Sequence, residues 1–567
     1  MKKKIALILV FALIVGILSG CGATNNNNNS EVVPQPEVKS EFIFDLEKNY
    51  VGQYTTEYED GNYYTFKTYQ AAYCDTPYTD EWKNAADYFK LNIKVPVSFN
   101  DKQFDQAGMA DAPIMFYNPW SGDRGSSPVG KEDAVDNEVV ADALARGWVV
   151  VTPGMRGGNN CFSGTIGQDD YVNYGKLPGP LADLKAAIRY LRYETNAETI
   201  PGDKEHIWIS GKSSGGSSTI MIGVSGNSPF FDEALEEIGA LPGRDDVFGA
   251  LTSAPVLTRS WADPAMAWEH WGDLRNVEGA DELNVFLTTA YIDYLNGLGL
   301  KATFDVEGKI KKGDALTSEN YADYLMMYVK QSAIKYLNNL GGRESINNYL
   351  AEGRTNDRWI QPSPETSRDW IKPVFDENDP NRVVDIEGTW DEFWDYFVGE
   401  DADDYTKRTG LLLFDGPAGY LPDELLEENG VGNSEGAKDY ASLSSPSFGK
   451  TSDYIAVYSE WGREWIQKER GITISDEYQK LLQMQSDSIN AMYFVNGEGA
   501  SGATVCPNWF LRGGGLDFVV PWPTFVNLAV GLENMGKNVN AGFDWEEGHV
   551  ITSDRPAFFD FAEEAMK

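Results

Sequence analysis

Short apolar runs alternate with amphipathic segments in two parts of the chain. Residues 112–117 (APIMFY) and 148–151 (WVVV) are continuous apolar runs, each followed by a turn with proline and glycine, and a helix-compatible segment separates them. Such runs are typical of parallel strands that are buried on both faces of a sheet. A third run, residues 207–209 (IWI), passes through a glycine to Ser213 and then into a further apolar helical pattern. The pattern predicts an α/β fold with a mostly parallel, doubly wound sheet.

The segments around these runs complete the predicted core. Leu184, Ala187, Ile188 and Leu191 recur at helical spacing and predict a helix over residues 181–194. The other predicted elements are edge strands within 43–110, strands at 248–251, 509–511 and 539–543, a glycine-rich turn over 512–521, and helices over 524–536 and 556–566.

The strand–helix alternation disappears between residues 259 and 485. Long helical stretches, acidic loops and scattered tryptophans replace it. The stretch is too long to be a loop of a compact domain. We therefore predict a core in two parts, residues 43–258 and 486–567, with a large, mainly helical domain inserted at 259–485.

The amino terminus has the features of an export signal. Three lysines at positions 2–4 precede an apolar run over residues 5–18, and the sequence Leu-Ser-Gly-Cys ends at Cys21. This ending resembles a bacterial lipobox, which implies a lipoprotein signal peptide over residues 1–20 and a lipidated Cys21. The alternatives are an uncleaved anchor or an ordinary signal peptide. The polar, asparagine-rich residues 21–42 are predicted to be a flexible tether. Each alternative places the chain outside the cytoplasm, and the lipidated Cys21 implies the cell envelope.

Charge and cysteine content narrow the classes of partner and cofactor. The formal net charge of −40 disfavours binding to nucleic acid or to anionic lipid, so contact with a membrane is predicted only through the lipid anchor. Besides Cys21 the chain has Cys74, Cys161 and Cys506, which allow at most one disulfide, and whether Cys161 and Cys506 pair is left open. With three histidines and no C-x-x-C spacing, no metal site and no cofactor are predicted.

The third apolar run ends in the pattern of a nucleophile elbow. Gly211, Ser213 and Gly215 form G-x-S-x-G between a predicted strand and a predicted helix. A strand that reverses sharply into a helix projects the serine from its tip and needs glycines where a Cβ would collide with backbone. A second copy of the pattern, around Ser434, follows an acidic stretch with no strand before it, and we interpret it as a loop.

A serine nucleophile needs a base within hydrogen-bonding distance. His206 lies at the start of the strand that leads to Ser213, at the opposite end of the sheet. His270 lies in the predicted insert, where packing or a lid role is expected. His549 follows the final predicted strand, and a loop there can reach Ser213, so we assign His549 as the base.

A carboxylate must hold the base in the right tautomer. Asp517 follows the preceding predicted strand and its glycines, and it is our choice. Asp544 is the second candidate, but it lies on the same loop as the base. The order Ser213, Asp517, His549 is the order expected of an α/β-hydrolase.

The oxyanion of an acyl-transfer intermediate needs two preorganised N–H donors. One is predicted to be the N–H of Ser214, directly after the nucleophile. The other is expected from the turn after residues 112–117, from Ser121 or Gly122, with Trp120 as an alternative. Pro119 is excluded because it has no N–H.

With these residues placed, the chain resembles the bacterial tannase family, α/β-hydrolases that cleave galloyl esters. The resemblance covers most of the core: residues 148–151, 183–193, 209–216, 509–513 and 532–539, with Asp517 and His549. It is weak in the insert, which that family has as a lid. It implies a serine esterase, acting through an acyl-enzyme on an ester of a phenolic acid, with the insert as a lid domain over the site.

One position departs from that family. In the tannases that bind gallate, the residue two after the catalytic aspartate is an acid that contacts a phenolic hydroxyl, whereas here it is Val519. Valine cannot accept that hydrogen bond, so a feruloyl or coumaroyl ester of plant polysaccharide fits as well as a tannin. The family also uses a lysine and a glutamate of the lid, for which Lys407 with Glu427 or Glu428 are the candidate equivalents.

Two other functions are compatible with the sequence. One is a serine peptidase of the same fold, whose lid would bind a peptide amine. The other is a non-catalytic lipoprotein that captures aromatic or sugar ligands, although Ser213, Asp517 and His549 in the expected order argue against it. The sequence therefore favours a small-molecule aromatic ester, or an ester-decorated plant polysaccharide, as the substrate.

Overall fold

The computed structural model describes most of the chain after the predicted tether. The described residues are 42–75, 78, 82–165, 168–269, 281–353, 367–398, 445–453, 458–470, 474–517, 519–549 and 554–567. Residues 40–567 form one compact unit. Cys21, the predicted signal peptide and nearly all of the predicted tether lie outside the described residues.

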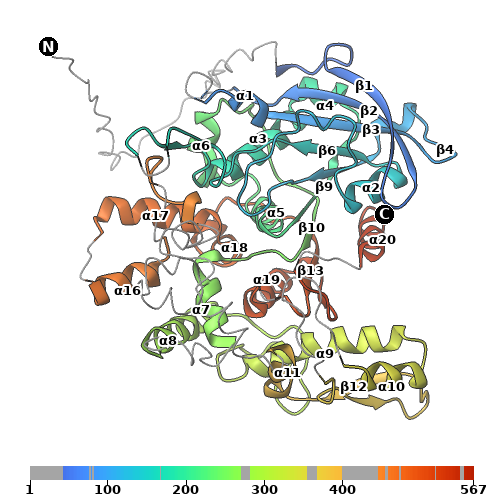
Figure 1. Cartoon of the computed structure of the whole chain (residues 1–567), viewed down its shortest axis with the longest axis vertical. Helices are drawn as coiled ribbons and strands as arrows, with labels where there is room; N and C mark the ends of the chain where they lie inside the picture. The colour runs from blue at the N-terminus through green and yellow to red at the C-terminus, as the bar shows by residue number, and fades with distance from the viewer. Residues whose placement is uncertain are drawn as a thin grey trace, which may run out of the picture. The chain divides into compact units, whose positions relative to one another are not determined.

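Within the described residues, ten strands form one central sheet in the order β1-β2-β3-β6-β5-β9-β10-β13-β14, with β4 beside β3 (Figure 1). The strands are β1 (Tyr50–Glu57), β2 (Tyr63–Ala72), β3 (Lys90–Phe99), β4 (Lys102–Gln103), β5 (Pro113–Tyr117), β6 (Val149–Pro153), β9 (Asp203–Lys212), β10 (Gly249–Ser253), β13 (Asn508–Gly514) and β14 (Asn538–Asp544). In this order, neighbouring strands from β6 to β14 pair in parallel. The pairs β1–β2, β2–β3 and β3–β6 are antiparallel. The predicted mostly parallel sheet is confirmed, and the predicted edge strands within residues 43–110 are found to pair antiparallel.

Helices and short hairpins connect these strands. The helices are α1 (Ala85–Tyr88), α2 (Glu138–Arg146), α3 (Gly179–Arg192), α4 (Glu194–Thr199), α5 (Ser214–Val224), α6 (Asp232–Glu237), α7 (Arg259–Glu269), α8 (Asp281–Gly297), α9 (Tyr321–Asn339), α10 (Arg343–Ala351), α11 (Trp390–Val398), α16 (Glu460–Arg470), α17 (Asp476–Ser488), α18 (Ala491–Val495), α19 (Trp522–Asn534) and α20 (Arg555–Ala565). Two small hairpins pair β7 (Phe162–Ser163) with β8 (Val172–Asn173), and β11 (Lys372–Phe375) with β12 (Val383–Glu387). None of the helices among the described residues is long and apolar enough to cross a membrane.

Side chains on the two faces of the sheet pack against different helices. On one face, Trp208 of β9 and Phe510 of β13 join a cluster of buried side chains from α2 and α20. Successive side chains of a strand point to opposite faces, so Trp509 lies on the other face. There α5 packs closely, because a Cβ on Gly223 would lie 2.5 Å from the Trp509 ring. This two-sided burial explains why the strands appear in the sequence as continuous apolar runs.

The predicted elements agree with the structure except at one strand end. Residues 512–514 are part of β13, not of the predicted glycine-rich turn, because Gly514 pairs with Asp544 of β14. A Cβ on Gly514 would lie 2.4 Å from the carbonyl oxygens of Glu547 and Gly548. The glycine is therefore needed for close packing, and the turn that carries Asp517 is shorter than predicted.

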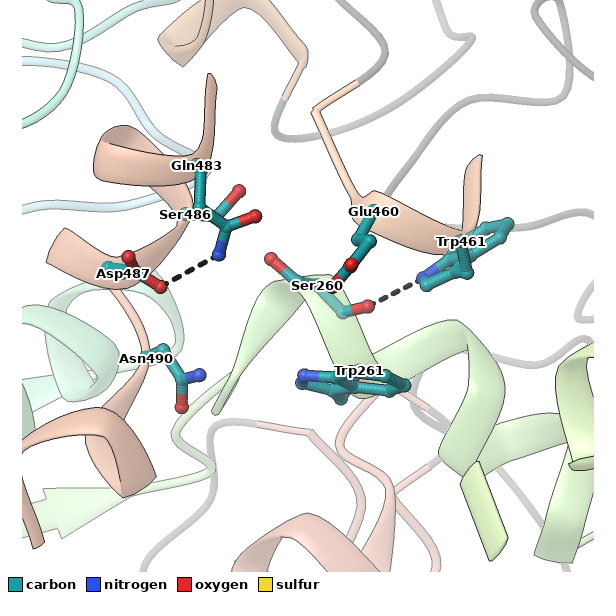
Figure 2. A pocket seen from close by; sticks show the side chains of 8 residues that line it. All are labelled: Ser260, Trp261, Glu460, Trp461, Gln483, Ser486, Asp487 and Asn490. Atoms are coloured by element: carbon teal, nitrogen blue, oxygen red, sulfur yellow. Dashed lines mark hydrogen bonds between the residues drawn. The ribbon is translucent and has the colours of Figure 1, made fainter. Parts of the chain in front are cut away.

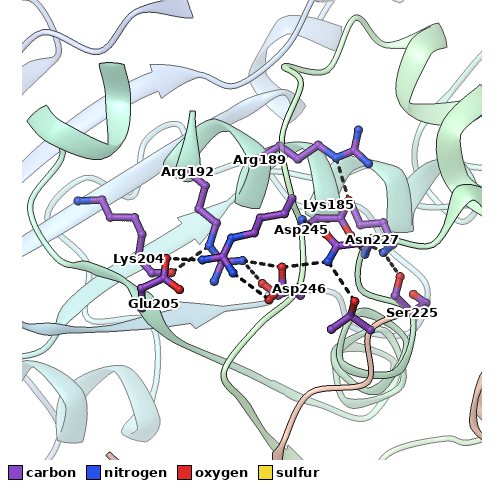
Figure 3. Close-up of polar contacts among 11 residues, drawn as sticks. Lys185, Arg189, Arg192, Lys204, Glu205, Ser225, Asn227, Asp245 and Asp246 are labelled. Atoms are coloured by element: carbon purple, nitrogen blue, oxygen red, sulfur yellow. Dashed lines mark hydrogen bonds and ion pairs between the residues drawn. The ribbon is translucent and has the colours of Figure 1, made fainter. Parts of the chain in front are cut away.

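The amino ends of β9 and β10 are held by a buried ionic network (Figure 3). Lys185 Nζ and Arg189 Nε of α3 each lie 2.8 Å from a carboxylate oxygen of Asp245. Asp245 also accepts the Asn227 N–H. Burial on its own would raise the pKa of Asp245, but the charges of Lys185 and Arg189 outweigh it and lower the pKa. This network lies at the edge of the sheet opposite Ser213.

As far as it is described, the long segment between β10 and β13 contributes helices α7–α11 and α16–α18 and the β11–β12 hairpin. The boundaries of the inserted domain, and its role as a lid, stay predictions. Cys74, Cys161 and Cys506 are buried free thiols, so the described residues contain no disulfide.

Candidate active site

Ser213 lies at the sharp turn between β9 and α5. Its φ of 53° is in the left-handed region, which a residue with a side chain seldom adopts. A Cβ on Gly211 would lie 2.4 Å from the Gly215 carbonyl oxygen, and one on Gly215 would lie 2.6 Å from that of Trp120. Both glycines of the motif are therefore required by close backbone contacts.

The structure brings Ser213, His549 and Asp517 together. His549 Nε2 lies 2.9 Å from Ser213 Oγ, and His549 Nδ1 lies 2.9 Å and 3.1 Å from the two carboxylate oxygens of Asp517. A carboxylate only accepts hydrogen bonds, so Nδ1 carries the proton and Nε2 accepts from the serine hydroxyl. Asp517 and His549 follow β13 and β14, whose carboxyl ends lie on the same edge of the sheet as that of β9.

Asp517 is fixed by its own loop. Its Oδ1 accepts the N–H groups of Val519 and Val520, at 2.8 Å and 3.2 Å. An orienting carboxylate contacts the imidazole Nδ1, and Nδ1 of His549 is hydrogen-bonded to Asp517 and not to the second candidate, Asp544. Asp544 is the last residue of β14. The carboxylate of the constellation is therefore Asp517.

A second buried carboxyl group, which sequence reasoning missed, lies near Asp517. Glu269, the last residue of α7, is 3% exposed and accepts the Trp522 N–H at 2.7 Å. Burial raises the pKa of Glu269 well above its ordinary value, and the negative charge of Asp517 adds to this rise. Burial therefore favours the protonated form of Glu269 more than it would for an exposed glutamate, against the opposing hydrogen bond from the Trp522 N–H.

The three predicted oxyanion donors have N–H groups that are available. Among the described residues, the N–H groups of Ser214, Gly122 and Ser121 have no hydrogen-bond acceptor. The Trp120 N–H instead donates to Asn118 Oδ1 at 3.1 Å, which argues against this alternative. Ser121 is exposed in the same turn, and its carbonyl accepts the Arg124 N–H at 3.0 Å.

An apolar cluster lies beside the constellation and contains one predicted substrate-binding residue. Val519 packs against buried side chains at the ends of β10 and β13 and on α7: Ala254, Val256, Ala262, Met266 and Val520. Ala254 directly follows Ser253, whose carbonyl accepts the Ser213 N–H at 3.0 Å. Val519 is thus surrounded by apolar side chains, close to the nucleophile Ser213.

The other predicted positions lie far from Ser213 or outside the described residues. His206 lies near the start of β9, about 20 Å along the strand from Ser213, and its Nδ1 is 2.6 Å from Asp203 Oδ2. His206 therefore cannot act as the base. Five predicted or discussed positions lie outside the described residues: His270, Lys407, Glu427, Glu428 and Ser434.

The loop that carries His549 is joined to the segment between β10 and β13 by an ion pair that the sequence did not reveal. Arg368 Nε and Nη2 lie 2.7 Å and 2.8 Å from the two carboxylate oxygens of Glu546. The Arg368 guanidinium also lies 3.9 Å from the centre of the Tyr349 ring, and Tyr396 Oη donates to Glu546. The pair holds the loop three residues before the base.

A small polar cavity lies between α7, α16 and α17 (Figure 2). It holds about 20 Å³, which is room for a single water molecule and not for a substrate. Trp461 Nε1 donates to the Ser260 carbonyl at 2.6 Å, and Gln483 Nε2 donates to Asp487 at 2.9 Å. None of Ser213, Asp517 and His549 lines this cavity.

Comparison with sequence families gives one match. The family named BD-FAE matches residues 170–246, which include Ser213 and the network around Asp245. The comparison with curated proteins found no match.

Solved structures resemble the chain over nearly its whole length. The tannin acyl hydrolase from Lactobacillus plantarum superposes with a TM-score of 0.65 at 20% identity, over 93% of this chain and 99% of that one. A tannin acyl hydrolase in complex with ethyl gallate has the same TM-score, identity and shares covered. The tannase of Fusobacterium nucleatum superposes with a TM-score of 0.64 at 22% identity, over 93% of this chain and 100% of that one. These likenesses confirm the predicted α/β-hydrolase fold.

Proposed function

We propose that the chain is a serine esterase that hydrolyses carboxylic esters of aromatic acids. The observation that carries this proposal is the continuous chain of hydrogen bonds from Ser213 Oγ through His549 to Asp517 at a nucleophile elbow. The BD-FAE match around Ser213 and the tannase-like fold support it.

Acylation follows from this geometry. Ser213 Oγ attacks the ester carbonyl carbon, forming a C–O bond while its proton passes to His549 Nε2. The carbonyl electron pair moves to the oxygen, which the N–H groups of Ser214 and the turn after β5 stabilise. The intermediate then collapses, the bond to the alcohol oxygen breaks, and the proton on Nε2 passes to the leaving alcohol.

Deacylation repeats the same steps with water. His549 Nε2 accepts a proton from a water molecule, whose oxygen attacks the acyl-enzyme carbonyl. The second tetrahedral intermediate collapses to the free acid, and the proton returns to Ser213 Oγ. Asp517 holds the imidazole in the tautomer that both steps need and stabilises its positive charge.

The apolar cluster around Val519 bears on the acyl group. One structural neighbour binds ethyl gallate and another 3,4-dihydroxybenzoate, so a phenolic acyl group is the starting expectation for this fold. Val519 offers no acceptor for a ring hydroxyl. We therefore propose that ferulate-like or less hydroxylated rings are cleaved at least as well as galloyl esters.

A fluorophosphonate probe tests the serine mechanism directly. The wild-type chain is expected to label at one serine, and S213A is expected to lose both the label and activity, by more than about 10⁴-fold in kcat. S434A, in the second copy of the motif, is the matched control and should label normally. Labelling that persists in S213A, or a folded wild-type chain that does not label, would contradict the proposal.

A substrate panel tests the ester class. Methyl ferulate, methyl gallate, p-nitrophenyl acetate and dipeptide anilides are compared, and esters are expected to be hydrolysed with methyl ferulate at least equal to methyl gallate. Hydrolysis of the anilides alone would favour the peptidase alternative. H549A should abolish turnover, whereas H270A should keep most of it.

The place of action is a separate proposal. We infer from the lipobox-like ending at Cys21 that the mature chain is lipid-anchored and acts in the cell envelope. Incorporation of labelled palmitate into the full-length chain, and its loss in C21A, is the expected result. A C21A chain that still carries the label would rule out Cys21 as the lipidated residue, and a wild-type chain that takes up no label would rule out the anchor.

A further inference from the structure

The turn between β5 and α2 passes directly over the start of α5. The Trp120 carbonyl oxygen faces Gly215, and the Asp123 N–H donates to Ser214 Oγ at 3.3 Å. Since the N–H of a trans peptide points opposite to its carbonyl, the Ser121 N–H points away from α5. Of the two predicted donors in this turn, Gly122 is therefore the better placed.

The peptide groups on both sides of Gly122 are fixed. The Ser121 carbonyl accepts the Arg124 N–H at 3.0 Å, which sets the direction of the Gly122 N–H. The Gly122 carbonyl accepts from Asn159 Nδ2 at 2.7 Å. Gly122 and Asp123 have φ values of 55° and 56°, so the turn holds two successive left-handed residues, one of which is not glycine. Such a conformation persists only when neighbouring groups enforce it.

One group that holds the Asp123 side of the turn is a buried ion pair. The Asp123 carboxylate accepts from Arg259 Nη1, and Ser447 Oγ lies 3.4 Å from the same carboxylate oxygen. The side chains of Asp123 and Arg259 are 2% and 1% exposed. The Arg259 guanidinium also lies 5.2 Å from the centre of the Trp120 ring, so it contacts the turn at two points.

Arg259 is the first residue of α7, where its positive charge opposes the helix dipole. Burying an arginine there is tolerable because Asp123 neutralises it. Arg259 and Ser447 both belong to the long segment between β10 and β13, whereas Asp123 follows β5.

We propose that Arg259 and Asp123 are positioning residues that hold the turn after β5 so that the Gly122 N–H serves as the second oxyanion donor. The proposal rests on the esterase function above. Through this pair, the segment between β10 and β13 helps to form the oxyanion site. Arg259 and Asp123 act on the position of the turn and not on the substrate itself. Without the ion pair the turn is no longer held. The Gly122 N–H then stabilises the charged oxygen of the transition state less well, and kcat falls.

The test compares two isosteric substitutions of buried, ion-paired aspartates. In D123N the asparagine tolerates the left-handed backbone, but the charge pairing with Arg259 is lost. We expect kcat to fall about 100-fold with KM within about threefold, as for loss of one oxyanion donor. D245N, at the opposite edge of the sheet, is the matched control and should keep kcat within about twofold of wild type.

Inhibitor binding separates positioning from general damage. Phenylboronic acid forms a tetrahedral adduct with the serine and places an oxygen in the oxyanion site, whereas benzoate is planar and does not. D123N should bind phenylboronic acid less tightly by about the same factor as its loss in kcat/KM, with benzoate affinity within about threefold. R259K should fall between wild type and R259M in kcat, because lysine keeps the charge but not the planar fork.

Three results would overturn the inference. They are a folded D123N with kcat within threefold of wild type, an unchanged affinity for phenylboronic acid, and a loss in kcat no larger than that of D245N. If D123N does not fold, the R259K variant is the test. A kcat of R259K within twofold of the wild-type value would then overturn the proposal. A wild-type chain that neither labels with fluorophosphonate nor cleaves any ester contradicts the esterase function itself.

Discussion

At the scale of single residues, the function depends on which carboxylate orients His549. Asp517 contacts His549 Nδ1 and is itself fixed by two N–H groups of its own loop. Asp544 lies near in sequence, but it ends β14 and the imidazole nitrogen is already occupied. The two aspartates therefore make a matched pair for substitution.

We predict that D517N lowers kcat about 10⁴-fold, because an amide can hold the imidazole in the wrong tautomer while the geometry is kept. D544N, read as the control under the same conditions, should lower kcat less than tenfold. Both are measured with the best ester of the panel, alongside thermal unfolding. Equal losses in the two variants would show that the assignment of Asp517 is wrong.

The residues that sequence reasoning identified share one property: each follows a predicted strand and has few competitors. Three histidines in the chain leave one that follows the final strand. Four of the missed residues act in two pairs, Asp123 with Arg259 and Arg368 with Glu546. Their partners lie 136 and 178 positions apart in the sequence, and nothing local marks a buried arginine as the partner of a particular acid.

At the scale of elements, the active site is a set of loops at the carboxyl edge of a parallel sheet. The apolar runs predicted these strands well, because burial on both faces removes polar residues from them. The end of β13 was predicted wrongly because glycines indicate a turn in the sequence. In the structure, Gly514 remains in the strand to let the loop of His549 approach its backbone.

The loop of His549 gives a prediction at this scale. E546Q breaks a two-pronged, largely buried ion pair with Arg368, and we expect kcat/KM to fall about tenfold because the loop is held less firmly. The unfolding free energy should fall by about 3 kcal/mol, as for a buried pair that loses one partner. Steady-state kinetics and urea denaturation measure the two effects.

A double-mutant cycle provides the control. If the pair acts as a unit, the double variant E546Q/R368M should lose little more kcat/KM than R368M alone. Additive losses in kcat/KM would mean that Arg368 and Glu546 act independently, and the loop would then be positioned by other contacts.

At the scale of the whole molecule, helices α7, α16 and α17 meet around the small polar cavity of Figure 2. Sequence patterns gave helices in this region but could not show how they pack, because the polar groups come from three separate segments. Asp487 of α17 is the charged group that this packing affects most clearly. Burial raises the pKa of Asp487 to about 6, Glu498 and Glu460 add to the rise, and Gln483 and Arg463 oppose it.

This raised pKa fixes the sign of a pH effect on stability. Between the unfolded value of about 3.9 and the folded value of about 6, the folded chain binds more protons than the unfolded chain at Asp487. The contribution of this residue to the unfolding free energy therefore falls as pH rises through that window and stays low above it. At neutral pH the ionised Asp487 destabilises the fold.

We predict that D487N is more stable than wild type at pH 7.5, by on the order of 1 kcal/mol after allowing for solvent screening of a partly exposed group. The asparagine oxygen can still accept from Gln483 Nε2. At pH 4 the two proteins should be nearly equal, because wild-type Asp487 is then protonated in the folded state. D476N, at an exposed position of the same helix, controls for the loss of one charge. Urea denaturation at the two pH values measures the difference, and a D487N chain that is less stable than wild type at pH 7.5 would mean that the ionised carboxylate stabilises the contact between α7, α16 and α17.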